Sequence, residues 1–195
     1  MLAEALLLSG PVPVSSLVSI MEETPSDMPA REALLDAAMG PMRRRKSSEA
    51  IRRDRLPAQG LAFVAKDENG TLVGTVRLWS VAAGDDDRPA LLLGPLAVAK
   101  GSEGLGLGTR LMRRAIAEAA WRGHRAVLLV GDPDYYERFG FSAAKASGLA
   151  MPGPFERHRM LGLELADNTL KGASGMIRPT GRLIDAVEEN AALVA

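Results

Sequence analysis

The chain has 195 residues, of which 47% are hydrophobic and 25% are charged, and its formal net charge is +0. These values are typical of one globular domain, and the neutral balance predicts no nucleic-acid or membrane partner. Cysteine is absent and histidine occurs twice, which excludes disulfides and a cysteine nucleophile and predicts no metal site. Because a chain without cysteine suits a reducing compartment, we expect a cytoplasmic protein.

The first segment, residues 1–16, reads MLAEALLLSGPVPVSS. It is apolar, but it lacks a basic start, contains one glutamate and two prolines, and is too short to span a bilayer. We therefore expect a flexible leader here, or a start placed too early, rather than a signal peptide.

Hydrophobic patterning predicts strands and helices through the first half of the chain. Ser26 or Asp27 can cap a helix, Pro29 suits its first turn, and Gly40 can end it. Asn69-Gly70 favours a tight turn between two strands. The expected strands are 17–22, 61–66, 72–79 and the nearly continuous apolar run 90–98, and a short basic helix is expected over 47–53.

The second half of the chain contains the clearest helix, directly after a glycine-rich stretch. Its apolar residues recur at helical spacing from Leu111 to Ala120, and Gly123 fits the position after its end. Asp134 and Glu137 resemble a capping box at the start of a short helix. The other expected elements are a buried strand over 126–130, closing strands at Phe141 and over 159–165, and a last helical piece over 182–192.

Three alternating glycines, Gly104, Gly106 and Gly108, separate the apolar run 90–98 from this helix. Glycine lets a backbone approach a ligand closely, and a helix N-terminus attracts anions. A Walker loop would need lysine where Thr109 stands. A dinucleotide fingerprint would need glycine at Thr109 or at Leu111. The turn therefore either holds another phosphate-bearing ligand or is only a connection.

The surrounding sequence resembles the GNAT family of acetyl-CoA-dependent N-acetyltransferases. The resemblance rests on V-x-x-x-x-E-G-L-G-L-G-T-x-L-M followed by Y-Y-E-R-F-G-F, and it covers about residues 17–165. Within the family, the stretch "LGPLAV…GLGLG…GHRAVLLVGDPDYYERFGF" looks like the bacterial branch of predicted N-acetyltransferases. It implies an α/β fold of a single GNAT-type domain, with a mixed, mostly antiparallel twisted sheet flanked by helices and a splayed V between central strands that holds coenzyme A. We accordingly place the N-acetyltransferase domain at 17–165 and a C-terminal extension at 166–195.

The resemblance also implies which residues bind acetyl-CoA. The family signature Q/R-x-x-G-x-G/A maps onto Glu103–Gly108, whose backbone N–H groups would wrap the pyrophosphate. Glu103 departs from the signature, which has glutamine or arginine at this position. Its carboxylate adds no attraction for phosphate. Lys100, Arg110, Arg113 or Arg114 could compensate. The expected cofactor-binding residues are Leu96, Ala97, Val98, Glu103, Gly104, Leu105, Gly106, Leu107, Gly108, Thr109, Tyr135 and Tyr136.

Tyr136 is the expected catalytic residue, since it falls where the family often has a tyrosine that protonates the coenzyme A sulfur. A phenol with a pKa of about 10 stays protonated at neutral pH and can act as this acid. Tyr135, its neighbour, is more readily explained as a packing residue beside the coenzyme A tail.

The general base has no clear candidate, because residues 90–98 lack the glutamate that many family members carry there. Glu22, Glu23 and Asp27 are candidates by fold analogy, and Asp132 is either another candidate or a turn residue. The proton could also leave through water, or the amine could bind already neutral.

The basic segment 43–55, RRRKSSEAIRRDR, lacks the interleaved aromatic residues of a nucleic-acid-binding surface. It is either a solvated helix face or part of the acceptor side, where it would favour an acidic or carboxylate-bearing acceptor.

The predicted function is transfer of an acetyl group from acetyl-CoA to a primary amine by direct attack, with a small-molecule, peptide or protein acceptor. The alternatives are a non-catalytic acyl-CoA-binding module or sensor and a nucleotide-binding domain of another kind. A homodimer is a further expectation, because residues 166–195 exceed what the catalytic domain needs.

Overall fold

The computed structural model describes residues 18–184. The expected leader over 1–16 therefore lies outside the described residues, as does the expected last helix beyond residue 184. The helices are α1 (Met28–Met39), α2 (Ser47–Arg52), α3 (Leu107–Trp121) and α4 (Pro133–Tyr136). The strands are β1 (Ser19–Glu22), β2 (Ala62–Lys66), β3 (Leu72–Ala83), β4 (Arg88–Val98), β5 (Ala126–Val130), β6 (Leu149–Ala150), β7 (Met160–Glu164), β8 (Gly175–Met176) and β9 (Arg178–Pro179).

Short 3₁₀ turns connect several of these elements: η2 (Pro25–Asp27), η3 (Pro41–Arg45), η4 (Lys100–Ser102), η5 (Glu137–Phe139), η6 (Ala144–Ala146) and η7 (Arg157–Arg159). The main sheet has the order β1-β2-β3-β4-β5-β7, with β9 also paired to β3. Its pairings are antiparallel except for β4 with β5, which are parallel. The predicted mixed α/β fold with a mostly antiparallel sheet flanked by helices is thereby confirmed.

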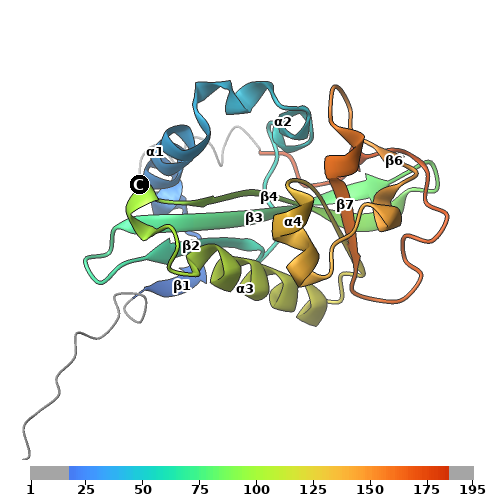
Figure 1. Cartoon of the computed structure of the whole chain (residues 1–195). Coiled ribbons are helices and arrows are strands. Elements are labelled where there is room, and N and C mark those ends of the chain that lie inside the picture. Colours follow the sequence, from blue (N-terminus) through green and yellow to red (C-terminus); the bar gives the residue numbers. More distant parts are fainter. Residues whose placement is uncertain (1–17, 185–195) are drawn as a thin grey trace, which may run out of the picture.

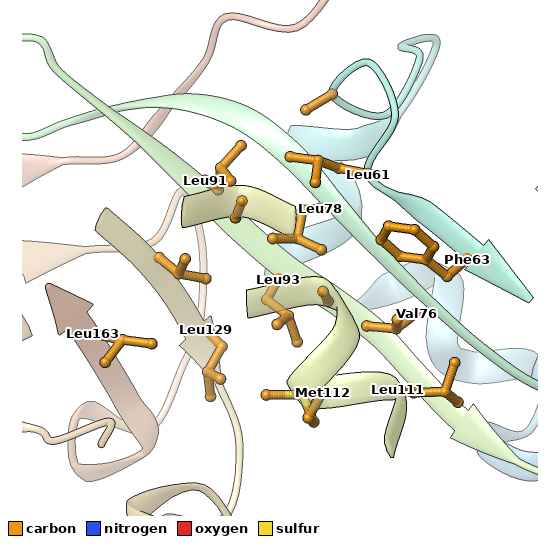
Figure 2. Close-up of a cluster of buried hydrophobic side chains, with 14 of the residues drawn as sticks. Leu61, Phe63, Val76, Leu78, Leu91, Leu93, Leu111, Met112, Leu129 and Leu163 are labelled. Carbon is orange, nitrogen blue, oxygen red and sulfur yellow. The ribbon is translucent and has the colours of Figure 1, made fainter. Parts of the chain in front are cut away.

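Helices cover both faces of the sheet. Figure 1 shows α3 on one face and α1 with α2 on the other. The apolar side of α3 packs on the sheet through Leu111 and Met112, which are fully buried beside Phe63, Val76 and other strand residues (Figure 2). Each large apolar side chain buried in this way contributes about 1.5–3 kcal/mol to the free energy of unfolding.

The central strands β4 and β5 separate after a short shared ladder. Their parallel pairs are Leu91 with Val127 and Leu92 with Leu128, although β4 continues to Val98. At the same point the β3–β4 register shifts, and the extra residue on β4 falls at Gly94-Pro95, which we term the β4 bulge. Gly94 has φ +128°, which favours glycine. The sheet therefore opens into a V between β4 and β5, as the resemblance implied.

Two expected details differ from the structure. Phe141 is not in a strand; it is a buried core residue, and only the following residue makes an isolated bridge to β7. Asp134 does not cap α4. The cap is Asp132, whose side chain accepts from the Asp134 N–H at 3.3 Å, because the Gly131-Asp132-Pro133 turn starts the helix one step earlier.

The segment after β7 returns to the sheet. Ile177 lies fully buried between β8 and β9, and β9 pairs with β3. Residues 182–184 are extended rather than helical: Leu183 bridges Arg55, and the N–H of Ile184 donates to the Asp54 carbonyl. The expected helix therefore does not begin at Arg182.

Candidate active site

The glycine turn that precedes α3 keeps its backbone exposed. Gly104 and Gly106 have φ of +76° and +72°, and Gly106 is the left-handed N-cap of α3. A Cβ at either glycine would meet nothing within 4 Å, so backbone conformation and not space requires glycine here. The first-turn N–H groups of α3 receive no side-chain cap. Donors at the positive end of a 15-residue helix form a suitable site for a phosphate group.

Gly108 is required for a different reason, because it lies against Tyr135. A Cβ at Gly108 would lie 2.7 Å from the Tyr135 hydroxyl and 3.8 Å from Val98 Cγ2. Gly108, Tyr135 and Val98, which were predicted from separate parts of the sequence, therefore lie together. Leu105 and Glu103 are exposed in the same turn, so the Glu103 carboxylate faces solvent.

Leu96, Ala97 and Val98 form the end of β4. Ala97 is buried against Leu34 and Leu35 of α1. Leu96 and Val98 are partly buried and pack toward the α3 side of the sheet. This alternation leaves the backbone edge of β4 facing the opening toward β5, beyond the last ladder pair.

Tyr136 lies at the mouth of this opening. It lines a cavity of about 120 Å³ together with Met39, Arg43, Lys46, Ser48, Arg52, Leu92, Leu93, Gly94, Pro95, Leu96 and Val130. Its ring packs edge-on against Tyr135, with 4.9 Å between centroids, and against Phe141 at 6.0 Å. Only glycine fits at position 131, because a Cβ there would lie 2.2 Å from Cε2 of the Tyr136 ring.

The Tyr136 phenol is held in its protonated form. Burial raises its pKa to about 12, with smaller contributions from Tyr135 and the Asp132 carboxylate, while Arg159 acts in the opposite direction. A protonated phenol beside the β4 bulge can donate a proton to an atom in the cavity.

The acids near β1 are already engaged elsewhere. Glu23, with 5% of its side chain exposed, accepts from Arg31 and from Arg77 Nε and Nη2, both at 2.8 Å. Asp27 contacts Lys66 at 2.6 Å. Burial raises the Asp27 pKa, but the hydrogen bonds from Lys66 and Thr24 outweigh it, and the net pKa is lowered. Glu22 is exposed on the edge strand.

None of these three residues, nor Asp132, is among the described residues that line the cavity around Tyr136. Asp132 acts as the cap of α4. The structure therefore does not bring any of the sequence-predicted base candidates to the proposed reaction centre.

A second, larger cavity of about 250 Å³ adjoins the first. Both are lined by Arg43, Arg52 and Pro95. The larger one, which we term the arginine pocket, is lined by Glu32, Leu35, Arg43, Arg44, Glu49, Arg52, Arg53, Asp54, Arg55, Arg77, Trp79, Pro95 and Ile184.

Sequence reasoning pointed to the basic segment but missed Glu32, Arg77 and Trp79 as pocket residues. No local pattern marks them, because they come from α1 and β3. Trp79 also supports the β4 bulge: its indole N–H donates to the Gly94 carbonyl at 2.6 Å.

Among residues 18–184, no three His, Asp or Glu side chains are grouped so that they could hold a metal ion. A search of the same residues for a helix long and apolar enough to cross a membrane found none.

Comparison with known proteins identifies the family. The sequence model of the acetyltransferase (GNAT) family matches residues 28–141. The chain belongs to this family, and it is accordingly an acyltransferase that depends on acetyl-CoA.

The chain is 32% identical over 163 residues to the Escherichia coli (strain K12) protein named uncharacterized N-acetyltransferase YhbS, a match that covers 81% of this chain and 93% of YhbS. The crystal structure of E. coli YhbS in complex with CoA is similar at 30% identity and a TM-score of 0.72, covering 83% of this chain and 89% of that one. A GNAT acetyltransferase from Brucella melitensis in complex with acetyl-CoA shows 26% identity and a TM-score of 0.58, covering 87% and 96%.

Proposed function

We propose that this enzyme transfers the acetyl group of acetyl-CoA to a primary amine by direct attack, without an acetylated enzyme. The carbon–nitrogen bond forms as the carbon–sulfur bond breaks, the amine loses one proton, and the sulfur gains one. The observation that carries this proposal is the meeting of the glycine turn, the β4 bulge and the two tyrosines around one opening of the sheet.

The residues around this opening fit acetyl-CoA. The first-turn N–H groups of α3, reached through Gly104 and Gly106, would hold the pyrophosphate. The exposed edge of β4 from Leu96 to Val98 would pair with the pantetheine arm, and Tyr135 would flank it. Acetyl-CoA supplies the activated acetyl group.

Tyr136 would act as the general acid. Its raised pKa, about 12, keeps the phenol protonated throughout the neutral range. Tyr136 lines the same cavity as Leu96 and Pro95, where the acyl group would end. An acid so placed stabilises the departing sulfur by delivering the proton that it needs.

The proton lost by the amine would pass to water. The described lining of the Tyr136 cavity includes no carboxylate. The adjoining arginine pocket shares Arg43, Arg52 and Pro95 with this cavity and would give water access to it. The acceptor would therefore react in its neutral form.

Calorimetric titration with acetyl-CoA, with ATP and NAD as controls, followed by mass spectrometry of an amine panel, tests this function. We expect saturable binding of acetyl-CoA alone and products 42 Da heavier than the amine, the mass of one acetyl group replacing one hydrogen. Binding without any acetylated amine, or formation of an acetylated enzyme that matures into product, would contradict the proposal.

A cytoplasmic location and a homodimer remain predictions from the sequence. Size-exclusion chromatography with light scattering tests the dimer, and a purely monomeric species would remove it.

A further inference from the structure

The arginine pocket carries more positive charge than its own acids can balance. Its lining includes six arginines against three acids, Glu32, Glu49 and Asp54. Glu32 already serves three cations: Arg31 at 2.8 Å, Arg43, and Arg44 at 3.4 Å. One carboxylate shared by three guanidinium groups leaves the surroundings cationic.

Arg52 is the least compensated of these arginines that are mostly buried. Only 11% of its side chain is exposed. Its Nη2 lies 3.1 Å from Ser48 Oγ and 3.2 Å from Glu49 Oε2, but its buried Nε has no hydrogen-bond partner among the described residues. Burial, opposed by Glu49 but reinforced by the charges of Arg43 and Arg77, lowers the Arg52 pKa.

A buried guanidinium with an unpartnered N–H is costly unless a further anion joins it. A buried donor left without a partner loses its hydrogen bond to water with nothing in return, and the loss is greater where the group is charged. Arg77 pairs with Glu23 through both Nε and Nη2, and Arg43 pairs with Glu32 and Asp36. Arg52 pairs with Glu49 through Nη2, and its Nε is left without a partner among the described residues. An anionic ligand is therefore favoured at Arg52 in particular.

Arg52 also stands between the two cavities. It lines the Tyr136 cavity and the arginine pocket, as Pro95 of the β4 bulge does. The pocket has an apolar wall as well, from Leu35, Trp79 and Ile184. A cationic rim beside an apolar wall suits a short aliphatic chain that ends in a carboxylate.

From these contacts, and on the basis of the proposed function, we propose that the acceptor is a small amine that bears a carboxylate. The carboxylate pairs with the Arg52 guanidinium, the aliphatic part lies along Trp79, and the amine reaches Pro95 from the side opposite the glycine turn. Arg52 is thus a specificity residue that binds the acceptor and takes no part in proton transfer.

Binding to the CoA-loaded protein, followed by backbone amide NMR, tests the inference without turnover. The probes are ω-amino carboxylates from β-alanine to 6-aminohexanoate, each matched with its carboxamide. The best carboxylate is expected to bind about 10- to 100-fold more tightly than its amide, the discrimination typical of a hydrogen-bonded charge pair. The shifted amides should include residues of α2 and the β4 bulge.

Variants locate the effect. Arg52→Gln should reduce the ratio between carboxylate and amide toward one, and Arg52→Lys should restore part of it, since lysine keeps the charge but not the planar fork. Arg45→Gln is the matched control: Arg45 belongs to the same basic segment but lines neither cavity. If Arg52→Gln does not fold, Arg44→Gln, at a side chain 63% exposed, should lower the ratio by a smaller factor.

Equal affinities for carboxylates and amides, no saturable carboxylate binding, or a ratio that survives Arg52→Gln would each overturn the inference. Failure of the proposed function has a different signature. In that case no amine is acetylated, with or without a carboxylate, although the carboxylate-bearing amines still bind. If only this inference fails, amines that lack a carboxylate are acetylated as well as those that bear one.

Discussion

The glycine turn before α3 and the arginine pocket beside α2 both reach β4, but they are built differently. The turn offers main-chain donors, and its requirements are glycines at Gly104, Gly106 and Gly108. The pocket offers side chains from α1, α2, β3 and β4. Under the proposed function, coenzyme A would bind to a main-chain site that is local in the sequence. The acceptor would bind to side chains that come from several elements.

The comparison is sharpest at Tyr136, between the two regions. Tyr136→Phe keeps the ring that packs on Tyr135 and Phe141 but removes the acid. We expect the turnover number to fall by about 10²- to 10⁴-fold. The acetyl-CoA dissociation constant should stay unchanged. Thiol release measures the turnover number, and calorimetry measures the dissociation constant. Tyr135→Phe is the matched control, and an equal loss in both variants would refute a special role for Tyr136.

Buried ion pairs beside the arginine pocket contribute to the stability of the fold. Glu23→Gln would leave Arg31 and Arg77, with side chains 6% and 16% exposed, without their shared charge. Loss of one partner from a buried pair costs about 3–5 kcal/mol in the free energy of unfolding. Urea denaturation measures this. A change below 1 kcal/mol, a value on the order of an exposed pair, would show that the network is not effectively buried.

The pH dependence distinguishes an acid from a base at the reaction centre. With no carboxylate lining the described Tyr136 cavity, kcat/KM should rise about tenfold per pH unit until the acceptor amine is neutral. The Tyr136 pKa of about 12 in the folded state exceeds the ordinary value of about 10 in the unfolded state. The contribution of Tyr136 to the free energy of unfolding is therefore complete below a pH of about 10 and is lost as the pH rises toward about 12. The rate profile is accordingly measured below a pH of about 10. A plateau that begins well below the pKa of the amine would reveal a protein base.

On the cofactor side, Gly106→Ala tests the backbone site. Left-handed backbone at the N-cap costs a residue with a side chain about 1–2 kcal/mol. We expect acetyl-CoA binding to weaken by about 5- to 30-fold if that strain is relieved by moving the turn. The affinity for carboxylate acceptors should not change. Calorimetry of both ligands measures the contrast, and a joint loss would mean that the two regions are coupled.

The smallest expected effect is at Glu103. Its exposed carboxylate lies in the turn before α3, where it would repel a phosphate group. Glu103→Gln should tighten acetyl-CoA binding by about two- to fivefold at low salt, as for other exposed charges near a helix terminus. The gain should disappear at high salt. Weaker binding in the variant would show that the carboxylate contacts the ligand productively.

The sequence by itself determined the local features of this protein. Asp27, Pro29 and Gly40 mark α1, and the spacing of apolar residues from Leu111 onward marks α3, because capping and helical periodicity act over a few residues. The alternating glycines of the turn were evident for the same reason, whereas the left-handed backbone at Gly104 and Gly106 is seen only in the structure. Asp134 was wrongly predicted as a cap, since Asp132 was equally suitable, and only the direction of the turn decides between them.

Only the tertiary structure decided what meets across the sheet. The contact of Gly108 with Tyr135 joins α3 to α4, and the pairing of Glu23 with Arg77 joins the end of β1 to β3. The place of Arg52 in the lining of both cavities depends on how α2 packs against β3 and β9. These contacts bring together residues far apart in the chain. A single sequence does not reveal them, because burial and ion pairing depend on the packed neighbours and not on local propensity.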